Sequence, residues 1–190
     1  MNPFALGVCG FGRCGSSMVM RMLDAGGLPP AAGSSPRAYE LPDLSPDSLT
    51  TLDLTGRAVK LLDYAQWHGI DTLPDIPWRF VFVERNHKQQ ATSMIKFLRG
   101  IGGIEDLAPN ATSAFRRSFD NDKPGLLRDL RGRGEVHVMR YELVLADPFR
   151  EAQRLADFVD IDAVAAASVV HIRSGDCAPD LTFEMSGVAS

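Results

Sequence analysis

Small, basic and hydroxyl-bearing residues gather in one glycine-rich segment near the start of the chain. Residues 10–17 read Gly-Phe-Gly-Arg-Cys-Gly-Ser-Ser, after an apolar run over 4–9 and before a second apolar run. Glycines let a backbone approach a ligand closely. A helix that begins near Ser16 would direct N–H groups and its positive dipole end at this loop. Because Arg13 adds a planar cation and Ser17 a further hydroxyl, the segment predicts a phosphate or sulfate site.

The spacing of Gly10 and Gly15 is that of a Walker A loop, but Ser16 stands where such a loop has its lysine. An ordinary ATPase or GTPase is therefore not favoured. A P-loop kinase for a small molecule is one alternative, and it would need the missing lysine and a carboxylate such as Glu84 or Asp63 to hold Mg²⁺. A non-catalytic nucleotide-binding protein of the same fold is another.

A second set of anion-binding residues follows the clearest apolar run of the chain, over 79–84. Arg85 comes directly after this run, and Ser93 stands eight residues later. Asn86 is predicted to cap a helix over about 87–99. A guanidinium can hold phosphate oxygens bidentately, and a hydroxyl two turns along the helix can complete the site. The sequence thus predicts two anion-binding segments, each at the carboxyl end of a strand.

Strands and helices are predicted to alternate along the chain. The strands are expected over 4–9, 57–62, 79–84 and 135–140. The helices are expected from 16 to about 25, from Ser45 to near Gly56, over 87–99, over 111–131 as one helix or two broken near Pro124, from 148 to about 159, and over 162–170. This order predicts an α/β three-layer sandwich with a central parallel sheet and with ligands at the carboxyl ends of its strands.

The composition is that of one globular domain over 1–190, with 45% apolar residues, 23% charged residues and a net charge of −4. This charge gives no general attraction to nucleic acid or to anionic membranes. The apolar start has no basic region before it and is too short to span a membrane, which predicts a cytoplasmic protein. The tail 174–190 is expected to be loosely packed.

The three cysteines lack the spacing of a metal site, so no metal is expected; they are Cys9, Cys14 and Cys177. Cys9 is expected in the core. Whether the Cys14 thiol, which lies in the loop, is reactive stays open.

The motifs resemble those of the sulfotransferase family. Residues 13–17 resemble its 5′-phosphosulfate-binding loop, Arg85 and Ser93 its 3′-phosphate site, and residues 138–148 the strand-to-helix passage near the end of many of its domains. His87 departs from the family's usual Pro. The resemblance implies a P-loop-like sulfotransferase fold, 3′-phosphoadenosine 5′-phosphosulfate (PAPS) as donor and adenosine 3′,5′-bisphosphate (PAP) as product. It assigns the donor site to Gly12, Arg13, Cys14, Gly15, Ser16, Ser17, Arg85 and Ser93.

The reaction that the resemblance implies is transfer of a sulfuryl group to a hydroxyl or amine, which needs cations on the sulfuryl oxygens and a base. Arg13 and Lys60 are candidates for the cations. Members acting on carbohydrates use a glutamate some twenty residues beyond the first helix, which makes Glu40 the first candidate base. Cytosolic members use a histidine as the base, but Leu62 stands at the comparable position here. Asp63 is the second candidate and His68 the third.

The resemblance also implies a small-molecule or carbohydrate acceptor and allows a homodimer, with no nucleic-acid or membrane partner. Phe115 and Phe119 are expected either to pack on the adenine of the donor or to belong to the core. In this family the acceptor pocket and the dimer contacts are formed by variable loops. The identity of the acceptor and the oligomeric state therefore stay open.

Overall fold

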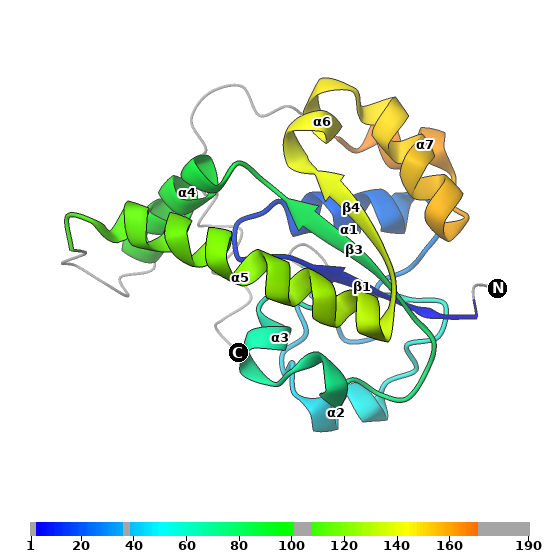
Figure 1. Cartoon of the computed structure of the whole chain (residues 1–190). Coiled ribbons are helices and arrows are strands. Elements are labelled where there is room, and N and C mark those ends of the chain that lie inside the picture. Colours follow the sequence, from blue (N-terminus) through cyan, green and yellow to red (C-terminus); the bar gives the residue numbers. More distant parts are fainter. Residues whose placement is uncertain (1–2, 36–38, 101–107, 171–190) are drawn as a thin grey trace.

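A computed structural model of the chain describes residues 3–35, 39–100 and 108–170. Its centre is a parallel sheet whose strands lie in the order β2-β1-β3-β4 (Figure 1). The strands are β1 (Ala5–Cys9), β2 (Ala58–Lys60), β3 (Trp78–Glu84) and β4 (Gly134–Arg140). Each predicted strand is therefore present. Because all four run in the same direction, their carboxyl ends meet at one edge of the sheet.

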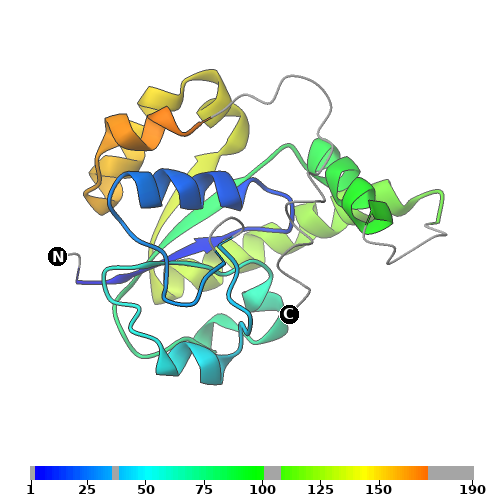
Figure 2. The ribbon, with the colours of Figure 1, turned by 180° about the vertical axis from the view of Figure 1, so that it is seen from behind.

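Helices cover both faces of the sheet, which confirms the predicted three-layer α/β sandwich (Figures 1 and 2). One face packs against α1 (Ser16–Ala25), α6 (Tyr141–Ala146), α7 (Pro148–Val159) and α8 (Ala163–Ser168). The other packs against α2 (Pro46–Thr51), α3 (Tyr64–Trp67), the 3₁₀ turn η1 (Ile70–Thr72), α4 (His87–Gly100) and α5 (Ala111–Arg133). Successive side chains of β3 point to opposite faces of the sheet. Val81 and Val83 belong to the hydrophobic core on the first face, and Phe80 and Phe82 belong to the core on the second.

Local signals in the sequence explain where several helices begin and end. Asn86 Oδ1 accepts hydrogen bonds from the N–H groups of Lys88 and Gln89, and so caps α4 as predicted. Asp147 caps α7 in the same way, by accepting from the Arg150 N–H. Ser45 and Ser48 form a capping box at the start of α2. Side-chain oxygens of these types satisfy N–H groups that a helix start leaves unpaired.

One sequence-based boundary was wrong, one open alternative is resolved by the structure, and one helix was missed. Helix α2 ends at Thr51 instead of near Gly56, because Leu52 is already extended and the chain continues to Leu54, which is buried. Of the two alternatives for 111–131, the structure shows a single helix: α5 runs without a break through Pro124, so the loss of one backbone donor there does not divide it. A short helix, α6, was also missed. It turns the chain sharply between β4 and α7.

Helices α4 and α5 pack on each other and extend beyond the carboxyl edge of the sheet (Figure 1). Across the described ranges, no helix has the length and apolar character needed to cross a membrane. The tail 174–190 and Cys177 lie outside the described residues.

Candidate functional site

The glycine-rich loop connects the end of β1 to the start of α1 at the carboxyl edge of the sheet. Gly15 has φ +105°, in the left-handed region, and a Cβ atom there would lie 2.5 Å from Cδ2 of Tyr141. The loop therefore needs glycine at this position for two reasons. Helix α1 begins without a side-chain cap, so its first turn presents its dipole and backbone donors to the loop.

The two predicted anion-binding segments lie against each other. Nε of Arg13 donates to Oγ of Ser93 at 3.4 Å, and a terminal nitrogen of Arg85 donates to the carbonyl of Arg13 at 3.2 Å. The Arg13 guanidinium also lies 5.0 Å from the centre of the Phe97 ring. Arg85 and Ser93 are only 7% and 3% exposed. The Arg13 guanidinium thus lies against a buried hydroxyl, and Arg85 is hydrogen-bonded to the backbone of the same loop, so basic and hydroxyl groups that can bind an anion share this edge of the sheet.

A third segment brings Lys60 and Glu40 to the same place. Nζ of Lys60, at the end of β2, lies 2.7 Å from Oε1 of Glu40 and donates to Oγ of Ser17 at 3.0 Å. Lys60 is 6% exposed, whereas the Glu40 side chain is 62% exposed. A buried ammonium that contacts both a loop serine and an accessible carboxylate can stabilise negative charge next to a group that accepts a proton.

Asp63, the second candidate base, adds a carboxylate to this edge. Burial raises the pKa of Asp63, a hydrogen bond from the Gly12 N–H acts in the opposite direction, and the charge of Glu40 adds to the rise. Four described residues other than glycine have left-handed backbone conformations, and three of them, Arg13, Tyr39 and Asp63, lie in or beside the site. Such conformations cost free energy and are concentrated at functional sites.

Solved structures with the same architecture decide the fold. A sulfotransferase domain from the curacin biosynthetic pathway matches with a TM-score of 0.57 and 16% sequence identity, over 93% of this chain and 81% of that one. A sulfotransferase from Alicyclobacillus acidocaldarius matches with a TM-score of 0.53 and 16% identity, over 99% and 92%. This chain has the sulfotransferase fold. No protein-family model matches the sequence, and no curated protein matches it either.

Within this sulfotransferase fold, Gln90 and Tyr141 fix the site but were not found by sequence reasoning. Nε2 of Gln90, which is 1% exposed, donates to the carbonyls of Phe11 and Gly12 at 3.0 and 2.9 Å, and so fixes the loop from α4. The Tyr141 ring lies 4.5 Å from the Arg85 guanidinium and also contacts Gly15. The sequence gives no signal for Gln90, because its burial and its contact with the loop arise only in the folded chain.

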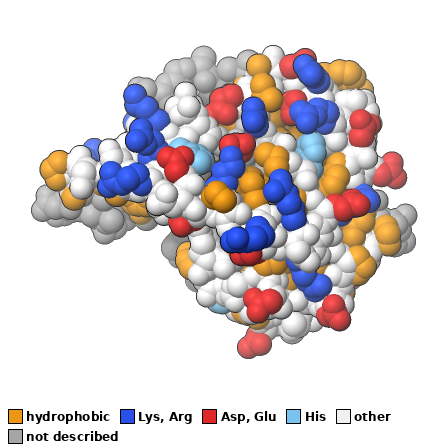
Figure 3. All heavy atoms as spheres, in the orientation of Figure 1, with side chains coloured by type: hydrophobic (Ala, Val, Ile, Leu, Met, Phe, Trp, Pro, Cys, Tyr) orange, Lys and Arg blue, Asp and Glu red, His pale blue; other side chains and the backbone are white. Residues whose placement is uncertain are grey.

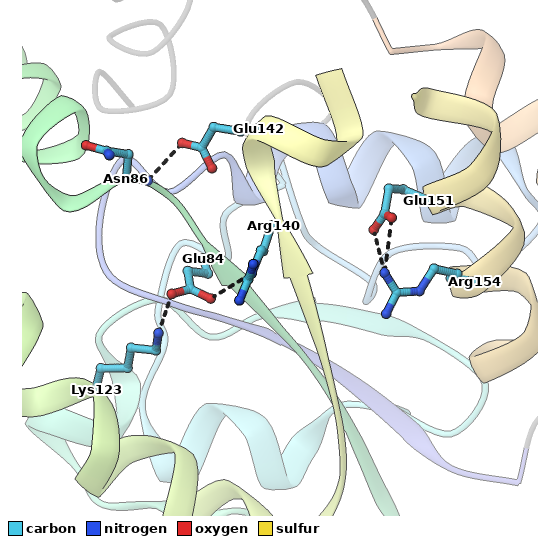
Figure 4. A network of polar contacts seen from close by, with 7 residues as sticks. All are labelled: Glu84, Asn86, Lys123, Arg140, Glu142, Glu151 and Arg154. Carbon is cyan, nitrogen blue, oxygen red and sulfur yellow. Dashed lines mark hydrogen bonds and ion pairs between the residues drawn. The ribbon is translucent and has the colours of Figure 1, made fainter. Parts of the chain in front are cut away.

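The segment from Arg140 to Glu142 connects β4 to the end of β3 and to the turn that follows β3. Oε1 of Glu142 accepts from the N–H of Asn86 at 2.8 Å (Figure 4). Glu84 lies between Lys123 and Arg140 in the same view, and is 3.6 Å from the latter. These contacts hold the β3–α4 turn, and with it Arg85, in position.

The structure also shows the surroundings of Phe119, His68 and Cys14, which the sequence analysis singled out. Phe119 is 5% exposed and stacks on Phe11 with ring centres 5.1 Å apart, so it belongs to the core. The His68 ring lies 5.0 Å from that of Tyr64. Burial raises the pKa of Cys14 to about 11, which makes its thiol neutral near pH 7. Its N–H donates to the Phe11 carbonyl at 3.2 Å.

The surface that carries α5 and β4 has no charge of a single sign. Lys and Arg side chains alternate there with Asp and Glu (Figure 3). Among the described residues, no group of three or more His, Cys, Asp or Glu side chains could hold a metal ion. The cations that could attract a nucleotide are therefore local ones, at the carboxyl edge of the sheet.

Proposed function

We propose that this chain is a sulfotransferase that moves the sulfuryl group of PAPS to a hydroxyl or amine of an acceptor. The observation that carries the proposal is the contact between Arg13 in the loop and Ser93 on α4. It brings together two segments, each of which the sequence assigned to a different phosphate of one donor. The sulfotransferase fold supports the same function.

Donor binding follows from the arrangement of these segments. The 5′-phosphosulfate would lie at the start of α1, where Gly15 allows a close approach and Ser16 and Ser17 supply donors. The 3′-phosphate would lie between Arg85 and Ser93. Since Arg13 contacts Ser93, its guanidinium lies between the two anionic groups and can interact with either.

Catalysis is assigned to Lys60 and Glu40. The acceptor oxygen or nitrogen forms a bond to sulfur while the bond from sulfur to the phosphate oxygen of the donor breaks, so PAP leaves with that electron pair. Glu40 takes the acceptor proton, since its carboxylate is accessible and lies 2.7 Å from Nζ of Lys60. Lys60 stabilises the negative charge on the sulfuryl and leaving oxygens.

Calorimetry with three nucleotides tests the proposal. We expect PAP to bind at least about tenfold more tightly than adenosine 5′-phosphate, because the additional phosphate meets Arg85 and Ser93, and charged hydrogen bonds are each worth about 1.5–3 kcal/mol. ATP with Mg²⁺ is the third ligand. Preferential binding of ATP would instead support a P-loop kinase, and binding of none would support neither enzyme.

A further inference from the structure

A cavity of about 310 Å³ lies beside the second half of α1. Helices α1 and α8 lie side by side at this place (Figure 2). The described residues that line the cavity come from α1, from the loop before β2 and from the end of α8, and they are Arg21, Asp24, Ala25, Tyr39 and Val169. None of them belongs to the donor site proposed above, so this cavity is a separate feature of the molecule.

Arg21 brings an unsatisfied cation to the wall of the cavity. Its side chain is half-buried, and its Nε is fully buried without a hydrogen-bond partner among the described residues. A buried donor that lacks an acceptor is costly, and a guanidinium can hold a carboxylate through two parallel hydrogen bonds. A carboxylate that enters this cavity would therefore meet a guanidinium with a donor still to satisfy.

Asp24 supplies the opposite charge. Its Oδ2 accepts a hydrogen bond from the Tyr39 hydroxyl at 3.2 Å, and the carboxylate is exposed, so it can also accept from a cationic group. A ligand with a single charge would meet one like charge in this cavity, whereas a ligand with both charges would have each of them paired. Ala25 and Val169 add apolar surface to the same wall.

Tyr39 connects the cavity to the segment that carries Glu40. Tyr39 is 6% exposed and has φ +58°, a conformation that costs free energy in a residue with a side chain. Its N–H donates to the Ser35 carbonyl at 2.9 Å, and the Ser35 N–H donates to the Glu40 carbonyl at 2.9 Å. A ligand that packs against Tyr39 therefore restrains the backbone that carries Glu40.

We propose that this cavity binds a free α-amino acid with an aliphatic side chain, its carboxylate on Arg21 and its ammonium group on Asp24. The aliphatic group lies against the apolar wall, and binding holds the segment of Tyr39 and Glu40 in place. The binding itself does not rest on the proposed function, because the donor site uses other residues. Where that function holds, the amino acid also regulates the position of the proposed base.

NMR titration of isotope-labelled protein with three probes of similar shape tests the inference. L-Leucine carries both charges, isocaproate lacks the ammonium group, and isoamylamine lacks the carboxylate. L-Leucine should shift the amide resonances of Tyr39 and Val169 at millimolar concentration. It should also slow hydrogen exchange at the Glu40 N–H, which donates to Oγ of Ser35 at 3.2 Å. Each analogue with a single charge should bind at least about tenfold more weakly than L-leucine.

Two variants assign the charges of the ligand to the side chains that pair with them. In Arg21→Gln, L-leucine should lose its advantage over isoamylamine, and in Asp24→Asn it should lose its advantage over isocaproate. The matched control is Arg128→Gln, which changes an exposed arginine of α5 and should bind all three probes as the wild type does. The Kd of PAP should change by less than about twofold in all three variants, a result that mere loss of folding would not give.

The outcomes separate this inference from the proposed function. The site would be overturned if millimolar L-leucine moved neither the Tyr39 nor the Val169 resonance. Equal affinities for L-leucine and either analogue would overturn the recognition of both charges. Unchanged hydrogen exchange at Glu40 in the leucine-bound protein would overturn the restraint on the base. Each of these results leaves the binding of PAP as it is, whereas failure of PAP to bind would overturn the function and leave the amino-acid site standing.

Discussion

Lys60 and Glu40 form an ion pair in which Nζ lies 2.7 Å from Oε1, and the same nitrogen reaches Ser17 of the loop at 3.0 Å. The pair joins the end of β2 to a loop residue twenty positions earlier in the chain. Its two members differ in exposure, since the lysine is buried and the glutamate is accessible. The buried member can stabilise charge while the accessible one exchanges a proton with an acceptor.

Replacing the glutamate of this pair should separate catalysis from donor binding. We expect Glu40→Gln to lower kcat by about 100-fold or more, which is the size of a typical contribution from a general base. The Kd of PAP should change by less than about twofold. Transfer of radiolabelled sulfate to an acceptor found by screening measures the first quantity, and calorimetry measures the second.

Asp43→Asn is the matched control, because Asp43 is an exposed carboxylate of the same loop. It should leave kcat close to that of the wild type. If Glu40→Gln and Asp43→Asn were equally active, Glu40 would not be the base, and Asp63 would become the first candidate.

A methyl group at Gly15 should disturb the loop beyond the cost of its backbone conformation. Gly15 and Gly27 both have positive φ, +105° and +98°, but only a Cβ at Gly15 would meet another residue, the Tyr141 ring at 2.5 Å. An L side chain in the left-handed region costs about 1–2 kcal/mol. Gly27→Ala should therefore lose about that much free energy of unfolding in urea, and Gly15→Ala should lose more and bind PAP more weakly.

Equal losses of stability in these two glycine variants would contradict the close packing of Tyr141 under the loop. The double variant Gly15→Ala/Tyr141→Ala provides a further check. It should show a smaller combined loss than the sum of its single changes, since the clash no longer exists.

Asp63 should make the protein less stable as the pH rises. Its pKa is raised in the folded state above the ordinary value of 3.8, chiefly by burial. The folded protein then binds this proton more tightly than the unfolded chain does. The resulting stability is fully present below pH 3.8 and is lost as the pH rises through the folded-state pKa.

Asp63→Asn removes this loss and can still accept the hydrogen bond from Gly12. The free energy of unfolding of the variant, relative to the wild type, should increase from about pH 4 upwards. Urea unfolding of both proteins across the acid range measures it. A difference that stays constant or falls with increasing pH would show that burial does not govern this carboxyl.

Cys14 should be unreactive in the folded protein despite its place in the loop. Its side chain is fully buried and its pKa is raised to about 11, mainly by that burial, so very little thiolate is present at pH 8. Peptide mapping after iodoacetamide treatment should find Cys14 unmodified in buffer and modified in urea. Rapid labelling in buffer would contradict the packing of the loop.

The strands, most helices and the position of the two candidate segments at the carboxyl edge of the sheet could be predicted from the sequence, because each depends on local patterns. The apolar run before Arg85, the cap at Asn86 and the glycines of the loop are examples. The fold itself is confirmed by the structural matches. The roles of Arg85, Ser93 and Glu40 stay predictions.

Contacts between distant segments could not be predicted. Gln90 reaches the loop across 78 and 79 residues, and Tyr141 meets Gly15 only once β4 lies beside β3. Helix α5 shows the reverse case, in which a strong local signal at Pro124 is overridden by its helical surroundings. Sequence patterns report local preference, whereas these features depend on the assembled sheet.

The preference for a 3′-phosphate, measured in variants of its proposed site, tests the central claim most directly. The ratio of the Kd values of adenosine 5′-phosphate and PAP should be at least about tenfold in the wild type and in Thr92→Ala, whose hydroxyl is exposed on the same helix. In Arg85→Ala the ratio should fall towards one. In Ser93→Ala it should also be much smaller than in the wild type. A ratio that is the same in all four proteins would contradict the account, because the 3′-phosphate would then not lie between Arg85 and Ser93.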